Sequence, residues 1–448
     1  MSGTSDNHRN PAAAVGASPF LRVPASLAVP FVLIAVFCLG AGAAHEPITT
    51  KVRFNKEVIR ILQRSCLGCH RPGGIAPMSL ASYEEARPWA KAIKEEMLEK
   101  RMPPWHAVKG YGEFRNAPSL TQREIDLVVN WVEGGAPKGD DKDLPQGPLY
   151  SDDWQLGPPD LVLTRDVLPP GDRLTESRSA RNAPQDSDET LSNSDGFRAF
   201  LLPTGLKEDR WLRAIDLQRR DDSIVHWAKF YAVKLESGES KDGMDGERTA
   251  SGPPPDANVV GTWIAGMRTV AFTDGVGHLL PAGSGILAII HYRGSGDAVR
   301  GFNAVGLYFT KAAPRQRLRQ VAITNAGVRI PAGAVDHRVV ASTIVQDGGE
   351  AVAILPAVNP LLISLQATAY RPDGTEEILI WTRGYQFDWQ PTYYYKRPVA
   401  LPKGTRVEVI AYFDNSDGNR NNPNDPPRDQ RWSDIAADAL CALLVARE

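Results

Sequence analysis

The chain has 448 residues, enough for two or three domains, and 42% of them are hydrophobic, which is enough to build real cores. Its 51 basic and 53 acidic residues leave a formal net charge of −2, so no global field points to nucleic acid or an anionic membrane surface as a partner. Of the four cysteines, Cys38 lies in an N-terminal leader and Cys66 and Cys69 share one motif, so only Cys441 is left over and a disulfide scaffold is excluded.

The first 44 residues have the pattern of an export leader. Arg22 precedes an uncharged run from Val23 to Ala44, and Ala41-Gly42-Ala43 offers small residues for cleavage. This pattern predicts a secretory signal peptide. The alternative is a retained membrane anchor over residues 23–44, because a run of 22 uncharged residues reaches spanning length. In both cases we expect the functional part to be periplasmic or otherwise exported.

Residues 51–140 are expected to form a small all-α domain. The apolar spacing predicts one helix over 55–62 and a second over 82–101. A third is expected to be capped by Ser119-Leu120-Thr121 and to end at Gly134-Gly135-Ala136-Pro137, with Ile125, Val128, Val129 and Val132 as a buried stripe around Trp131.

The first of these helices leads into Cys66-Leu67-Gly68-Cys69-His70, which has the C-x-x-C-H spacing of covalent haem c attachment. Each thiol can form a thioether to one haem vinyl group, and His70 is then placed to ligate the iron. The alternative is a redox dithiol that happens to precede a histidine. The appended histidine, the leader and the lack of a second C-x-x-C favour one haem c, with Cys66 and Cys69 as its covalent attachment.

A sixth iron ligand would be a thioether or an imidazole, and the candidates are Met78, Met97, Met102 and His106. Met97 falls on the apolar helix face and is more simply part of the core. Met102 precedes Pro103-Pro104-Trp105, so two prolines hold its backbone outside the helix. We expect Met102 to be the axial ligand, and His106 is the bis-histidine alternative.

Residues 141–160 are expected to be a linker, and the rest of the chain an all-β region. Alternating segments separated by turn residues such as Pro372-Asp373-Gly374 predict strands of a β-sandwich or jelly roll. These segments are residues 286–291, 304–309, 339–345, 361–370 and 406–413. Tyr393-Tyr394-Tyr395 is expected to be a strand with aromatic packing. Two polar inserts, 173–196 and 236–257, are expected to be surface loops.

Several stretches in order resemble the copper type II, ascorbate-dependent monooxygenases (peptidylglycine α-hydroxylating monooxygenase-like). They are similar in particular to bacterial multidomain relatives with a class I cytochrome c domain in front. The stretches include Phe54-Asn55-Lys56, the haem motif, Met102-Pro103-Pro104-Trp105, Trp154-Gln155-Leu156-Gly157-Pro158-Pro159-Asp160-Leu161, Phe387-Asp388-Trp389-Gln390 and Tyr412-Phe413-Asp414-Asn415-Ser416. The resemblance covers residues 51–448. It implies a cytochrome c domain over 51–140, a first jelly roll over 161–312 and a second over 313–448.

The family's chemistry needs two coppers, one held by three histidines and the other by two histidines and a methionine. In the first site His226 and His291 match the pattern, but Trp227 stands where the family has the second histidine. In the second site the histidines are missing from Pro356-Ala357-Val358-Asn359, and Leu440 stands where the methionine is expected. Ala357 and Leu440 cannot coordinate copper, so we expect this site to be lost and filled with apolar side chains.

We therefore expect an exported mono-haem c-type cytochrome that transfers single electrons. Its β region would be a catalytically degenerate scaffold or docking module, a pseudoenzyme, with no catalytic residues. His226 and His291 would remain as a two-histidine remnant of the copper site, and copper itself is not expected. The expected partner is a redox protein or a larger membrane-associated electron-transfer complex. One alternative is a copper- and haem-dependent monooxygenase that hydroxylates an organic substrate. The other is a structural or ligand-binding β module with a haem for stability or sensing.

Overall fold

The structure is a computed structural model and describes eleven stretches of the chain. They are residues 50–118, 120–147, 154–164, 196–219, 225–235, 257–292, 302–325, 327–356, 359–385, 389–431 and 439–448. The leader, most of both inserts, Ala357-Val358 and Phe387-Asp388 lie outside the described residues. None of the helices in the described stretches is long and apolar enough to cross a membrane.

The N-terminal part is helical, with its elements close to the predicted ranges. They are a π-helical turn η2 (Phe54–Val58), α2 (Ile59–Ser65), α3 (Tyr83–Ala86), the 3-10 turn η3 (Arg87–Trp89), α4 (Ala90–Leu98), α5 (Gln122–Glu133) and η4 (Asp141–Asp143). The single helix predicted over 82–101 is divided into α3, η3 and α4. Pro88, which cannot donate to the preceding turn, lies in the 3-10 segment at the division. Thr121 caps α5 as predicted, in a reciprocal capping box with Glu124.

The helices enclose one apolar core. Phe54, Val58 and Leu62 are fully buried, and the Trp131 indole lies among them and donates to the carbonyl of Pro137 at 3.1 Å. In the predicted stripe of α5, Val128 is buried with Trp131, and Ile125 and Val132 are partly buried against the same core. Met97 is a core residue, as expected.

The described chain contains far more strand than helix. The strands are β1 (Leu161–Thr164), β2 (Gly196–Pro203), β3 (Arg210–Arg219), β4 (Val225–Lys234), β5 (Asn258–Ile264), β6 (Val276–Leu280), β7 (Ser284–Tyr292), β8 (Phe302–Phe309), β9 (Gln316–Ile323), β10 (Arg329–Ile330), β11 (His337–Ile344), β12 (Gly349–Pro356), β13 (Leu362–Tyr370), β14 (Glu376–Arg383), β15 (Tyr393–Leu401), β16 (Arg406–Phe413), β17 (Gln430–Arg431) and β18 (Cys441–Arg447). The five predicted strands coincide with β7, β8, β11, β13 and β16, and the predicted turn at 372–374 separates β13 from β14.

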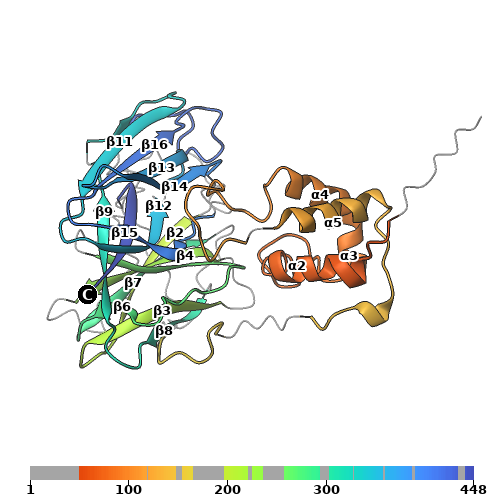
Figure 1. Ribbon diagram of the computed structural model, residues 1–448, viewed down its shortest axis with the longest axis horizontal. Helices are drawn as coiled ribbons and strands as arrows, with labels where there is room; N and C mark the ends of the chain where they lie inside the picture. The colour runs from red at the N-terminus through yellow and green to blue at the C-terminus, as the bar shows by residue number, and fades with distance from the viewer. Residues whose placement is uncertain are drawn as a thin grey trace, which may run out of the picture. The chain divides into compact units, whose positions relative to one another are not determined.

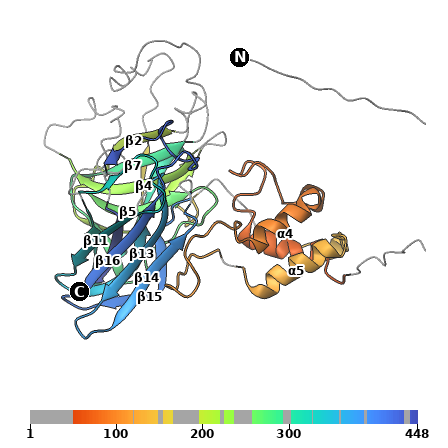
Figure 2. The ribbon, with the colours of Figure 1, turned by 90° about the horizontal axis from the view of Figure 1, so that it is seen from above.

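The strands form two four-stranded sheets, one long eight-stranded sheet and a short two-stranded ribbon, β10-β17. The four-stranded sheets have the orders β2-β7-β4-β5 and β11-β16-β13-β14, and Figure 2 shows the strands of each lying side by side. The long sheet has the order β1-β8-β3-β6-β9-β18-β12-β15. Because β6 pairs in parallel with β9, strands from both predicted jelly-roll segments share this one sheet.

The sheet β2-β7-β4-β5 is buried on both faces. On β4, Phe230 and Ala228 enter one apolar cluster, and Tyr231 enters another that includes Leu355 and Leu444 of the long sheet. Because other elements cover both faces of this sheet, β4 is buried almost throughout, and most of its side chains are apolar. The β region is therefore built of stacked sheets.

The segment from Trp105 to Asn116, between α4 and α5, belongs to the β region by its contacts. Ala107 forms a β-bridge with Thr382 of β14, and Phe114 forms one with Tyr395 of β15. The ring of Trp105 packs edge-on against Tyr393 at a centroid distance of 4.8 Å. Figure 1 shows this part of the chain reaching the strands around β14. The helical part is thus attached to the sheets by backbone pairing as well as by the linker.

Candidate functional site

The C-x-x-C-H motif forms a tight turn at the end of α2. The Cys66 amide caps the helix by donating to Leu62, and the amides of Cys69 and His70 both donate to the Cys66 carbonyl, at 3.1 and 2.9 Å. Cys66 and Met78 pack against the apolar core of the helical part. The turn therefore holds two thiols and an imidazole together at the rim of that core.

The imidazole of His70 has a fixed orientation. Its Nδ1 lies 3.2 Å from the backbone carbonyl of Met78, to which it donates in the Nδ1–H tautomer. Burial lowers the pKa of His70, with the Met78 contact acting in the opposite direction, so the neutral ring is favoured. A neutral imidazole whose Nδ1 donates to a carbonyl presents Nε2 as a free ligand, which is how metal-bound histidines are oriented. The donor set fits a haem iron.

The thiol chemistry does not match a redox dithiol. Burial, followed by the neighbouring Cys69, raises the pKa of the Cys66 thiol to about 12. Reactive C-x-x-C motifs depend on a lowered thiol pKa, because the thiolate is the nucleophile. Cys66 has the opposite shift, so it is not an activated thiolate.

The four candidates for the second axial ligand lie in different places. Met97 is buried in the helical core, and the Met78 carbonyl accepts from His70. His106 is 6% exposed, its ring lies 5.4 Å from that of Tyr385, and its carbonyl accepts from the amide of Arg383 on β14. Met102 lies just beyond α4, and its side chain is 41% exposed. It is therefore the candidate methionine that is not enclosed by the helical core or by the β region.

The structure brings His226 and His291 together. The register of β4 against β7 shifts between Val225 and Trp227, so His226 sits in a β-bulge. A bulge turns consecutive side chains toward one side of a strand. The rings of both His226 and Trp227 accordingly lie beside His291, at centroid distances of 5.8 and 5.5 Å, with the indole stacked at 23°. Trp227 thus occupies the place beside His291 that a third imidazole would need.

The region expected to have been the second copper site is apolar. Leu440 and Cys441 are fully buried in the core of the second half of the β region, together with Ile354 and Leu361. Asn359 is also buried, and its Oδ1 accepts from the amide of Leu361 at 2.8 Å. Leu440 and Ile354 are thus both buried in one apolar core. Within the described stretches, no group of three or more His, Cys, Asp or Glu side chains is placed to hold a metal ion.

The motif also touches the β region, which the sequence did not predict. The sulfur of Cys69 lies 3.6 Å from the carbonyl oxygen of Ala265, just after β5. Cys69 and Met267 pack against a small buried cluster of Trp227, Ile264 and Trp389. These residues are nearly two hundred positions from Cys69, so no local pattern could have indicated the contact.

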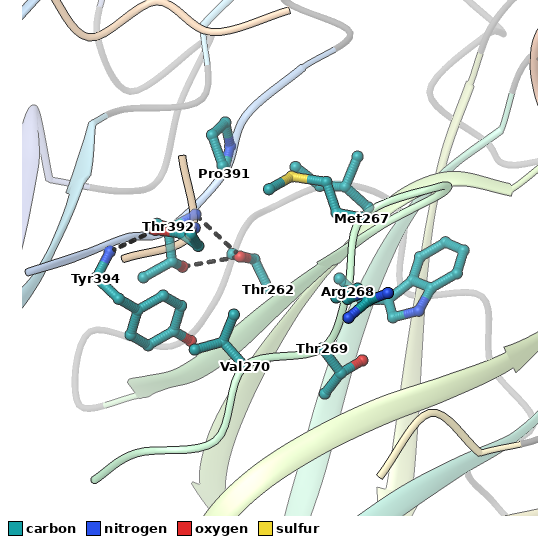
Figure 3. Close-up of a pocket in the computed structure, with 11 residues that line it drawn as sticks. Thr262, Met267, Arg268, Thr269, Val270, Pro391, Thr392 and Tyr394 are labelled. Atoms are coloured by element: carbon teal, nitrogen blue, oxygen red, sulfur yellow. Dashed lines mark hydrogen bonds between the residues drawn. The ribbon is translucent and has the colours of Figure 1, made fainter. Parts of the chain in front are cut away.

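Beside this contact lies a small hollow between the loop after β5 and the start of β15. Figure 3 shows Met267, Thr262 and Thr392 along it. The Thr262 and Thr392 hydroxyls are 2.8 Å apart, and Asn116 donates to the Thr392 carbonyl at 2.8 Å. The loop after β5 is therefore tied at its base to β15 and to the segment that begins at Trp105.

A buried histidine outside the motif predicts acid sensitivity. His278 on β6 is 5% exposed, and burial lowers its pKa from 6.5 to about 4. Between these values the unfolded chain takes up a proton that the folded chain does not, so the free energy of unfolding falls as the pH falls. At about 1.4 kcal/mol per pKa unit, the loss by pH 4 is about 3 kcal/mol.

We expect His278→Gln to remove this part of the pH dependence. Urea unfolding of the wild type and the variant at pH 7 and pH 5 measures this difference. An equal loss of unfolding free energy in the two proteins would contradict the role given to His278.

No protein-family model matches the chain, and neither does any of the curated proteins with which it was compared. Solved structures with some likeness include allantoicase, at 10% identity over 50% of this chain and 80% of that chain, with a TM-score of 0.18. Another is that of the infectious bursal disease virus Gx strain, at 10% identity over 59% of this chain and 84% of that chain, with a TM-score of 0.16. TM-scores this low carry no argument about fold or function.

Proposed function

We propose that this protein is an exported mono-haem c-type electron carrier with a β region that has no catalytic role of its own. In this proposal residues 51–140 are a cytochrome c domain, and residues 161–312 and 313–448 are two degenerate jelly rolls. The observation that carries it is the His70 imidazole, held by Met78 within an intact C-x-x-C-H turn.

Each residue of the motif then has one task. Cys66 and Cys69 hold the haem covalently, so it stays bound in both oxidation states. His70 would bind the iron through Nε2 while its Nδ1 donates to the Met78 carbonyl. Met102, whose side chain is 41% exposed, would be the second iron ligand. Haem supplies an iron centre that takes up and releases one electron.

The side chains at the positions that match the copper ligands of the monooxygenase family argue against copper-dependent hydroxylation. Leu440 has no donor atom, and Trp227 presents an indole in place of an imidazole. The proposed partner is therefore another redox protein, or a membrane-associated electron-transfer complex in which the β region is a scaffold or docking module.

The proposal predicts covalent haem that depends on the motif. Full-length protein produced with a c-type haem attachment system should carry one haem that denaturation does not extract. Cys66→Ala with Cys69→Ala should abolish attachment, because no thioether can form. His70→Ala should leave covalent haem with an altered visible spectrum, because the iron loses its imidazole.

Cys441→Ala is the matched control, because Cys441 is a buried thiol outside the motif. It should keep covalent haem. Mass spectrometry of the denatured chain and the pyridine haemochrome spectrum measure the outcome. Wild-type protein without covalent haem under these conditions would refute the proposed function.

A further inference from the structure

Two glycines meet where the haem motif touches the β region. A Cβ on Gly266 would collide with the sulfur of Cys69, and a Cβ on Gly68 would collide with the Gly266 carbonyl oxygen. Gly266 also has φ +84°, which disfavours any other residue. The two backbones can therefore approach this closely only because neither residue has a side chain.

Cys69 meets backbone atoms of the β region, with apolar side chains packed around them. The loop Ala265–Met267, called the cover loop below, lies over Cys69, and Trp227 and Trp389 pack behind it at 3% and 9% exposure. The Ala265 amide donates to the His226 carbonyl at 3.0 Å, and the Met267 amide donates to Ile264 at 3.0 Å. The cover loop is thus held by backbone bonds to β4 and β5.

Two further attachments hold the helical part against this loop. The segment from Trp105 to Asn116 pairs with β14 and β15. Asn116 binds Thr392, which binds Thr262 of β5, the strand that leads into the cover loop (Figure 3). The contact at Cys69 is therefore one of several that bind the helical part to the sheets.

We infer that the β region covers the edge of the haem that Cys69 holds, and that the cover loop sets the solvent access and the reduction potential of the iron. This inference rests on the proposed function, because it concerns a thioether at Cys69. A thioether joins the haem edge directly to the Cys69 sulfur, so the atoms around that sulfur are neighbours of that edge. The role of the β region is then to shield the haem from solvent and to set its reduction potential.

The direction of the effect follows from electrostatics. An apolar cover withholds water from the iron and disfavours the more positively charged oxidised state, which raises the reduction potential. Removing the cover should lower the potential. It should also allow faster electron exchange with a small reagent in solution.

The test compares Gly266→Ala with Gly275→Ala in the full-length, haem-loaded protein. Gly275 also has φ +84°, but nothing lies within 4 Å of a Cβ built there. Both substitutions therefore impose the same backbone strain, and only the first pushes against Cys69. We expect Gly266→Ala to shift the midpoint potential downward and to speed oxidation by ferricyanide several-fold, with Gly275→Ala unchanged in both.

Met267→Ala is the second variant, because it trims the cover loop without straining the backbone, and it should change both quantities in the same direction. Midpoint potentials come from spectroelectrochemical titration and rates from stopped-flow absorbance. The haem could be covalently attached while both Gly266→Ala and Met267→Ala keep the wild-type midpoint potential and oxidation rate. That result would overturn the inference about the cover loop and leave the proposed function standing. Wild-type protein without covalent haem would instead refute the proposed function.

Discussion

Trp131→Ala should destabilise the helical part by about 3–5 kcal/mol, the usual cost of truncating a buried aromatic side chain. Trp131 is completely buried in the helical core, where its ring lies 5.8 Å from that of Phe54. The substitution leaves a cavity and also removes the donor to the Pro137 carbonyl. Urea unfolding followed by haem absorbance measures the effect, because that signal arises from the helical part.

Trp89→Ala is the matched control, since Trp89 lies in the same helical part and is 43% exposed. It should cost less than about 1 kcal/mol, as surface substitutions do. Trp131→Phe keeps most of the packing and loses the hydrogen bond, so it should fall between the two alanine variants. Equal costs for Trp131→Ala and Trp89→Ala would show that the helical core is not organised around Trp131.

Trp227→His should enable the β region to retain one copper ion. The wild-type protein is expected to retain none. Trp227 is stacked on His291, and the ring of His226 lies 5.8 Å from that of His291. A histidine at 227 would add a third imidazole beside the existing two, and three imidazoles form a good copper site. Metal analysis after copper incubation and desalting, together with copper electron paramagnetic resonance, reads out the change.

Trp227→Phe controls for the loss of the indole, because it removes the same ring without adding a donor. It should retain no copper, and iron should stay near one per chain in all three proteins. Two coppers in the wild type would contradict the account of both lost sites. One copper in the wild type, lost in His226→Ala or His291→Ala, would show that the remnant pair already binds metal.

Much of the fold could be predicted from local patterns. Period-two alternation predicted β7, β8, β11, β13 and β16, and apolar spacing predicted the helices on both sides of the C-x-x-C-H motif. Boundaries failed where one residue overrides a pattern, as near Pro88, where a 3-10 turn divides the long predicted helix. The spacing on α5 identified an apolar face but not how much of it a neighbouring helix covers.

The candidate site divides in the same way. The motif could be identified from the sequence by itself, because its two thiols and its imidazole lie within five consecutive residues. The sequence also shows that Leu440 has no coordinating atom, whatever its surroundings. Only the tertiary structure decided that the Met78 carbonyl orients His70, that a bulge brings His226 and Trp227 beside His291, and that Gly266 meets Cys69. Those contacts depend on how strands and loops distant in the sequence pack, and packing between distant segments leaves no periodic trace in the chain.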